Sequence, residues 1–218
     1  PGIWMTLHYA PIAIIGVAGR YPMANSLEGY WENLRAGRDC ISEIPADRWD
    51  HQRYWSERKG EPGKSYSRWG GFIEGVDEFD PLFFRISPAE ARLMDPQERL
   101  FLQVAWHAIE DAGFTKAKRA ELTGGVFVGV MYGHYQLFGV PNSLRADGFI
   151  PNSSYASIAN RVSYVLDLHG PSMAVDTMCS SSLTAIHLAI QSILAGECDF
   201  AIAGGVNLSI HPSKYQLL

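Results

Sequence analysis

Cysteine is scarce in this sequence. The 218 residues include three cysteines, Cys40, Cys179 and Cys198, and no two of them form a Cys-x-x-Cys pair. Disulfide-stapled domains need many closely spaced cysteines, and structural zinc sites need paired ones. The sequence therefore excludes a disulfide framework and gives no support to a structural metal site, so each cysteine is expected to be a free thiol.

Long apolar runs and long basic runs are also missing. No apolar run reaches the roughly 18 residues that cross a bilayer, and residues 1–10 lack the basic-then-apolar order of a signal peptide. We therefore expect a cytoplasmic protein without a membrane partner. The formal charge is -5 with both signs mixed along the chain, so nucleic acid is not an expected partner.

Three common catalytic motifs are absent as well. The chain has no Gly-x-x-x-x-Gly-Lys-Ser/Thr loop, no His-Glu-x-x-His and no Gly-x-Ser-x-Gly. Their absence removes the main support for a P-loop enzyme, a zinc protease of that type and a serine hydrolase. Any chemistry must come from another arrangement of residues.

What the sequence does have is a high apolar content, 47%, distributed in short runs. Residues 12–16 form a continuous apolar run typical of a buried strand. Two further runs, 125–130 and 199–204, are apolar enough to be strands covered on both faces of a sheet. Residues 38–80 show little periodicity, so a long ordered excursion with turns is expected there, and residues 1–10 are expected to be a tail or linker.

Helix signals alternate with these strands. Asn25 with Glu28 resembles a capping box, and Ser87 and Asp95 each precede a proline, which predicts three helix starts. Gly37 and Gly113 are expected to end the first and third of these helices. The third carries an apolar stripe made of Leu100, Phe101, Val104, Ala108 and Ile109. Strands that alternate with helices predict an α/β fold.

The sharpest local arrangement surrounds Cys179. Residues 171–177 form a short strand-like run, and a helix is expected soon after Cys179, ending at Gly196. An apolar stripe on one face of that helix is formed by Leu183, Ile186, Ile190, Ile193 and Leu194. A sulfur atom at a helix start is favoured as the thiolate by the free backbone N–H groups and the helix dipole. The backbone N–H of Cys179 is also a candidate donor to an oxyanion.

Alternative interpretations of these residues remain open. A free cysteine is more often a buried small hydrophobe than a nucleophile, and for Cys40 and Cys198 we favour that reading because neither precedes a helix. A cysteine hydrolase would need a histidine to activate water, and none is placed by spacing. His187 lies ~12 Å along the helix from Cys179, while His134 and His211, just past strands, are the best candidates.

Several ordered motifs together resemble the β-ketoacyl synthases of modular type I polyketide synthases. They begin with residues 12–16 and Gly19-Arg20-Tyr21-Pro22, and continue through the chain as Phe79-Asp80-Pro81-Leu82-Phe83-Phe84, Met94-Asp95-Pro96-Gln97-Glu98-Arg99, Glu110-Asp111-Ala112-Gly113, Asp176-Thr177-Met178-Cys179-Ser180-Ser181-Ser182 and Ala203-Gly204-Gly205-Val206-Asn207. The resemblance implies a thiolase-like fold of layered αβαβα type, with residues 11–218 as the amino-terminal half of the ketosynthase domain.

The resemblance also implies a function. Cys179 would accept an acyl chain from the phosphopantetheine arm of an acyl carrier protein, for decarboxylative Claisen condensation with a malonyl-type extender. It implies a homodimer, with the strand before Cys179 near the interface, and neighbouring synthase domains as further partners. No bound cofactor or metal is implied, because the carrier brings the prosthetic arm.

The sequence departs from the family pattern at one position and stops short of it at others. Met178 stands where the family usually has alanine, and its longer side chain is expected to alter the acyl tunnel. The two family histidines that assist decarboxylation, and a second oxyanion donor, are expected beyond Leu218. Two alternatives therefore stand beside elongation: a ketosynthase that only transfers acyl chains, and a catalytically incomplete fragment that serves in dimerisation or docking.

Overall fold

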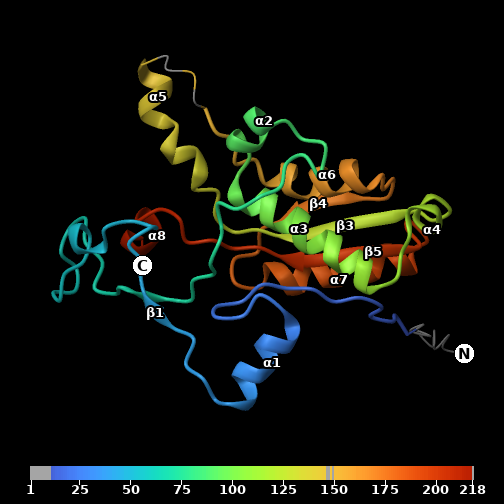
Figure 1. Ribbon diagram of the computed structural model, residues 1–218, viewed down its shortest axis with the longest axis horizontal. Helices are drawn as coiled ribbons and strands as arrows, with labels where there is room; N and C mark the ends of the chain where they lie inside the picture. Colours follow the sequence, from blue (N-terminus) through green and yellow to red (C-terminus); the bar gives the residue numbers. More distant parts are fainter. Residues whose placement is uncertain (1–10, 146–147, 149, 218) are drawn as a thin grey trace, which may run out of the picture.

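A parallel sheet forms the centre of the computed structural model, which describes residues 11–145, 148 and 150–217. The predicted tail, residues 1–10, lies outside the described residues. The sheet contains β3 (Gly124–Gly129), β4 (Ser172–Val175) and β5 (Phe200–Gly205) in the order β4-β3-β5 (Figure 1). Because all three strands are parallel, their carboxyl ends meet at one edge of the sheet.

Helices cover both faces of this sheet. α6 (Tyr155–Leu166) connects β3 to β4 and lies with α3 (Pro96–Asp111) on one face. α7 (Ser181–Leu194) connects β4 to β5 and packs on the opposite face (Figure 1). The α/β prediction is confirmed, and the layers are those of one half of the thiolase-like fold.

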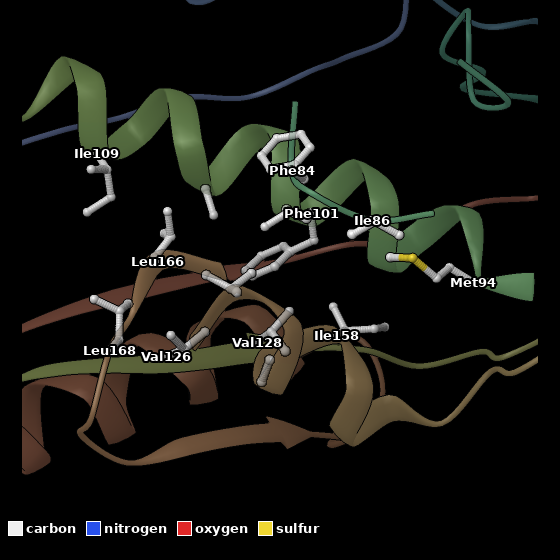
Figure 2. Packing of buried hydrophobic residues seen from close by; sticks show 14 of the residues in the cluster. Phe84, Ile86, Met94, Phe101, Ile109, Val126, Val128, Ile158, Leu166 and Leu168 are labelled. Carbon is white, nitrogen blue, oxygen red and sulfur yellow. The ribbon is translucent and has the colours of Figure 1, made fainter. Parts of the chain in front are cut away.

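The core follows the alternation of side chains along β3, whose six residues are all buried. Val126 and Val128 point to the face covered by α3 and α6, where they join a large apolar cluster (Figure 2). Phe127 points to the other face and packs against Ala185 and Ala189 of α7. β3 is therefore covered on both faces, as predicted.

The remaining elements frame this core. They are α1 (Leu27–Arg35), β1 (Ser42–Glu43), η1 (His51–Arg53), β2 (Trp69–Gly70), α2 (Pro88–Leu93), α4 (Lys116–Ala120), η2 (Tyr135–Phe138), α5 (Val140–Arg145) and α8 (Ser213–Gln216). β1 and β2 pair in an antiparallel fashion within the predicted excursion, residues 38–80. That segment lies beside α8, because the Tyr215 hydroxyl donates to the Trp69 carbonyl at 3.0 Å.

The predicted helix starts are confirmed at two of three positions. Ser87 Oγ accepts from the Glu90 N–H, and Asp95 Oδ1 accepts from the Gln97 N–H. At the first helix the cap is Ser26, which accepts from the Gly29 N–H, and the prediction of Asn25 is wrong by one residue. Serine and asparagine are nearly equal as caps, so adjacent candidates are not separable by residue type alone.

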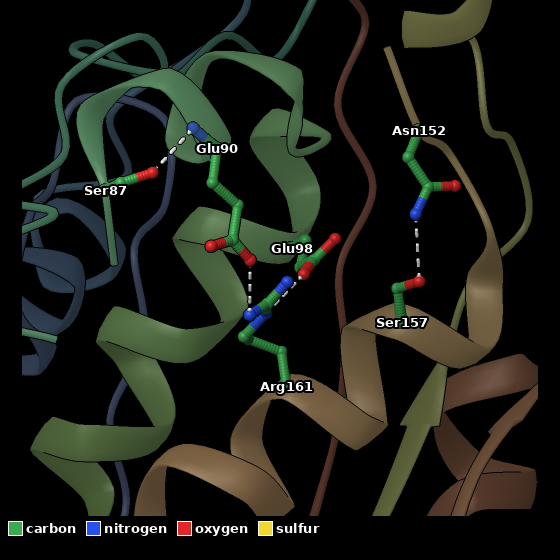
Figure 3. Close-up of polar contacts among 6 residues, drawn as sticks. All are labelled: Ser87, Glu90, Glu98, Asn152, Ser157 and Arg161. Carbon is green, nitrogen blue, oxygen red and sulfur yellow. Dashed lines mark hydrogen bonds and ion pairs between the residues drawn. The ribbon is translucent and has the colours of Figure 1, made fainter. Parts of the chain in front are cut away.

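Arg161 joins three helices through two carboxylates. Its Nη1 lies 2.8 Å from Glu90 Oε1 of α2, and its Nε lies 2.9 Å from Glu98 Oε1 of α3 (Figure 3). Glu98 is 1% exposed, and this burial raises its pKa although Arg161 acts in the opposite direction. These two ion pairs hold α6 against α2 and α3. Loss of Arg161 would leave the buried Glu98 carboxylate without a compensating charge.

The strand predicted for residues 12–16 is wrong. The segment has no regular structure, and Ile14 is 85% exposed. It runs along α3 instead of pairing in the sheet, since the Val17 N–H donates to Asp111 Oδ2 at 2.8 Å. An apolar run predicts strand propensity but does not supply a neighbouring strand, and neither edge strand of the described sheet pairs with it.

The stripe predicted on α7 faces away from the sheet. Leu183 is 72% exposed, while the buried residues of α7 are the small ones, Ser181, Ala185, Ala189 and Ser192. The close approach of helix and sheet selects small side chains on the inner face, which leaves the large apolar ones outside. β5 is also more open than predicted, because Ala203 and Gly205 are exposed.

Truncation of Leu102 tests the large core cluster. Leu102 is fully buried on α3, and we expect Leu102→Ala to lower the free energy of unfolding by about 2–5 kcal/mol, because it removes apolar contacts and leaves a cavity. Leu144→Ala is the matched control, since Leu144 is 84% exposed. Urea unfolding of the domain measures both, and equal losses in the two variants would contradict the core assignment.

Candidate active site around Cys179

Cys179 lies in the turn between β4 and α7. Its side chain is exposed, and it directly precedes Ser180, the residue that caps α7. The strand, turn and helix predicted from the sequence are therefore confirmed, with Cys179 two residues before Ser181, the first residue of the helix.

Hydrogen bonds within residues 176–181 hold this turn in shape. Asp176 Oδ1 accepts from the Met178 N–H at 2.9 Å. The Ser181 hydroxyl accepts from the Thr177 N–H at 2.9 Å and donates to the Met178 carbonyl at 2.6 Å. Met178 has a left-handed φ of 58°, which costs about 1–2 kcal/mol for a residue with a side chain. The surrounding bonds offset this cost and fix the sulfur at the turn.

Two glycines let α7 approach the sheet at this point. A Cβ atom on Gly129, at the end of β3, would lie 2.6 Å from the backbone of Ser181 and of Ser182. A Cβ atom on Gly205, at the end of β5, would overlap the Ser182 hydroxyl. The first turn of α7 thus rests directly on the carboxyl ends of both strands.

A pocket of about 240 Å³ opens beside the sulfur. Its walls come from the turn before α7 and from the segments that follow β3 and β5, and they include Met131, Met178, Cys179, Val206 and Asn207. The carboxyl edge of a parallel sheet is where α/β proteins bind ligands. The exposed Cys179 therefore lies in the wall of a ligand-sized pocket.

The other cysteines lie elsewhere. Cys198 is buried, and its thiol donates to the Ser192 hydroxyl at 3.4 Å. Cys40 is half-buried in the loop after α1, with its Sγ 3.7 Å from the Arg38 carbonyl oxygen. Neither lines the Cys179 pocket, which supports the choice of Cys179 among the three.

Gln97 joins the segments that form two walls of the pocket. Its Nε2 donates to the Tyr132 carbonyl after β3 at 2.7 Å, and its Oε1 accepts from the Leu208 N–H after β5 at 2.9 Å. Sequence analysis treated residues 94–99 as a helix cap and a family motif and missed this bridge. Its partners lie 35 and 111 residues away along the chain, so local spacing carries no signal of it.

The two histidines favoured by sequence analysis lie near one another. The rings of His134 and His211 are 6.3 Å apart, and burial lowers the pKa of each. Neither lines the Cys179 pocket, and His187 is exposed on α7. Lys214 repels His134, and its Nζ donates to Asn207 Oδ1 in the pocket wall at 2.7 Å. No local pattern in the sequence predicts that Lys214 and Asn207 form a pair.

Within residues 11–145, 148 and 150–217, no group of three or more His, Cys, Asp or Glu side chains is arranged to hold a metal ion. In the same part of the chain no helix has the length and apolar character needed to span a membrane.

Comparison with known proteins places this geometry in a family. Residues 9–218 match the family described as β-ketoacyl synthase, N-terminal domain. The chain belongs to this family. It is 62% identical over 207 residues to the polyketide synthase ThaG of Burkholderia thailandensis and 61% identical over 214 residues to the polyketide synthase PksL of Bacillus subtilis. The match covers 95% of this chain but only 4% and 5% of those two synthases.

Solved ketosynthase domains share the fold. The oxazolomycin ketosynthase domain OzmH KS7 of Streptomyces albus superposes with a TM-score of 0.92 at 58% identity, over 94% of this chain and 35% of that domain's chain. The ketosynthase from module 6 of the bacillaene synthase of Bacillus subtilis gives 0.84 at 40% identity, over 94% and 34%. The β-ketoacyl synthase chain described here therefore spans about a third of these ketosynthase structures.

Alanine at Gly129 tests the close packing beneath Cys179. The added Cβ would meet the backbone of α7, so we expect Gly129→Ala to lower the free energy of unfolding by about 1–3 kcal/mol and to slow alkylation of Cys179 by iodoacetamide. Gly204→Ala is the matched control, because a Cβ there meets only the Phe101 ring at an ordinary 3.5 Å. Equal effects of the two substitutions on both measurements would contradict the packing argument.

Proposed function

We propose that this chain carries the nucleophile of a polyketide chain-elongating β-ketoacyl synthase. The observation that supports the proposal most directly is the exposed sulfur of Cys179, at the start of α7 and in the wall of the pocket at the carboxyl edge of the sheet. The family match and the likeness to polyketide synthases set the reaction class.

Acyl transfer to Cys179 is the first half of the reaction. The thiolate attacks the carbonyl carbon of an acyl thioester on the phosphopantetheine arm of an acyl carrier protein, and the backbone N–H of Cys179 donates to the oxyanion that forms. The carbon–sulfur bond to pantetheine then breaks, and the pantetheine thiol leaves with a proton. The acyl group stays on Cys179 as a new thioester.

Condensation is the second half. A malonyl-type extender on a carrier loses carbon dioxide, and the resulting carbanion attacks the carbonyl carbon of acyl-Cys179. A carbon–carbon bond forms, the Cys179 thiolate leaves, and the lengthened β-ketoacyl chain remains on the extender's carrier. No cofactor or metal of the protein's own enters these steps.

The proposed partners follow from the same reaction. They are the acyl carrier protein with its phosphopantetheine arm, neighbouring synthase domains, and a second copy of the domain in a cytoplasmic homodimer. The position of β4 supports the dimer, because β4 is an edge strand of the described sheet and an edge strand offers unpaired backbone groups to another chain.

Acyl transfer without elongation is the second candidate function. It needs only the groups described for acyl transfer, the exposed sulfur of Cys179 and the pocket beside it. A role limited to dimerisation or docking would require neither the exposed sulfur nor the pocket beside it.

Substitution of Cys179 tests the nucleophile. In the complete ketosynthase domain, we expect Cys179→Ala to abolish covalent labelling by an acyl carrier thioester, because the accepting sulfur is gone. Cys40→Ala is the control and should label like the parent. Intact-protein mass spectrometry reads the added acyl mass, and undiminished labelling of Cys179→Ala would overturn the proposal.

Carbon dioxide release separates the two candidate functions. The complete domain is first acylated on Cys179 and then given a malonyl carrier. Elongation is expected to release one carbon dioxide per acyl group and to place a β-ketoacyl chain on the carrier, both measurable by isotope release and mass spectrometry. Acyl transfer with no carbon dioxide release would favour the second candidate.

A further inference from the structure

Lys214 is held against the wall of the Cys179 pocket. It lies in α8, and its Nζ donates to Asn207 Oδ1 at 2.7 Å. The ammonium group also lies over the ring of Tyr132, 5.2 Å from the ring centre. Asn207 follows β5 and Tyr132 follows β3, so this single side chain contacts the segments that form both strand-derived walls of the pocket.

In the described part of the chain Lys214 makes no ion pair. The titratable side chains near it include Tyr132, whose ring lies under the ammonium group, His134, which it repels, and His211, whose carbonyl accepts from the Lys214 backbone N–H. Burial lowers the pKa of Lys214 to about 8, and burial followed by repulsion from His211 and Lys214 lowers the pKa of His134. A half-buried ammonium that faces an amide oxygen and an aromatic ring is thus held by Asn207 and Tyr132.

This contact decides the orientation of the Asn207 amide. An ammonium group has donors only, so the amide oxygen must face Lys214. Because the amide is planar, fixing Oδ1 also fixes the direction of the NH2 group. Asn207 lines the Cys179 pocket, and its NH2 group is the donor that remains for a molecule bound there.

We propose that Lys214 is a positioning residue that, through Asn207, makes the Cys179 pocket select acyl groups with an oxygen on the β carbon. The inference rests on the proposed acylation of Cys179. The thioester oxygen is assigned to the Cys179 N–H at the turn, whereas Asn207 belongs to a different wall, at the end of β5. Its NH2 group therefore serves an oxygen further along the acyl chain, such as a β-hydroxyl group.

The selection depends on the charge of Lys214. Below pH 8 the ammonium group can only donate, and it holds the amide oxygen. Above pH 8 the neutral amine can also accept, so the amide is free to turn its NH2 group toward Lys214 and away from the pocket. The preference for β-hydroxyacyl groups should fall as the pH rises through about 8.

The test compares two small thioesters on the complete ketosynthase domain. The domain is given either the butyryl thioester of N-acetylcysteamine or one enantiomer of the 3-hydroxybutyryl thioester, and both enantiomers are used. Acylation of Cys179 is followed by mass spectrometry. The measured quantity is the ratio of the two kcat/KM values, at pH 7 and pH 9. Taking a ratio cancels any change in the reactivity of the sulfur itself.

Four variants accompany the parent domain. Lys214→Met removes the ammonium group, and Lys214→Arg restores a donor-only side chain that does not titrate in this range. Asn207→Asp keeps the contact with Lys214 but removes the NH2 donor. This variant tests the inference even if Lys214→Met does not fold. Lys118→Met is the matched control, because Lys118 also lies over an aromatic ring, 4.2 Å from the centre of Phe114, but on α4.

The expected result is a preference of about tenfold for one 3-hydroxybutyryl enantiomer at pH 7, the size of one hydrogen bond. The preference should persist in Lys118→Met and Lys214→Arg, and fall to about onefold in Lys214→Met and Asn207→Asp. At pH 9 the preference should fall in the parent but not in Lys214→Arg.

An unchanged ratio in Lys214→Met or Asn207→Asp would overturn the inference alone, whereas a parent domain that neither thioester acylates would overturn the proposed function as well.

Discussion

The contact between the first turn of α7 and the ends of β3 and β5 is the constraint on which the candidate site depends. Gly129 and Gly205 allow the helix backbone to rest on the sheet, and the buried face of α7 is made of small residues for the same reason. Cys179 stands just before that turn, so the position of its backbone depends on how the helix rests on the sheet. If Cys179 is the nucleophile, as proposed, its backbone is placed by the fold before a substrate binds.

A second layer of bonds holds the pocket walls above this contact. Gln97 spans the segments after β3 and β5, and Asp95 accepts from the Ser153 hydroxyl at 2.7 Å next to it. Both residues are buried at the start of α3. α3, which contributes many residues to the core, thus also fixes the edge of the sheet where the pocket lies. Residues at the start of this helix therefore contribute both to stability and to the geometry of the pocket.

Sequence reasoning predicted the strand, turn and helix around Cys179 because their signals are local. The strand-like run, Cys179 and the helix that follows lie within about 25 residues, and helix caps at Ser87 and Asp95 depend on neighbours three residues away or fewer. Sequence reasoning failed where contacts between distant segments determine the structure. The run at residues 12–16 has strand propensity but no neighbouring strand in the described sheet, and the residues of α7 that are buried against the sheet are small ones. The Gln97 bridge and the Lys214 contact with Asn207 join distant segments, which no local pattern encodes.

Met178 has a consequence for how such domains diversify. Its side chain is 61% exposed and belongs to the pocket wall, while its backbone is held by Asp176 and Ser181 independently of what the side chain is. A substitution that keeps the left-handed backbone can therefore reshape the wall next to the sulfur with little effect on folding free energy. Single mutations at this position can therefore change the shape of the pocket wall and still leave a folded protein, without the compensating mutations that a buried residue would require.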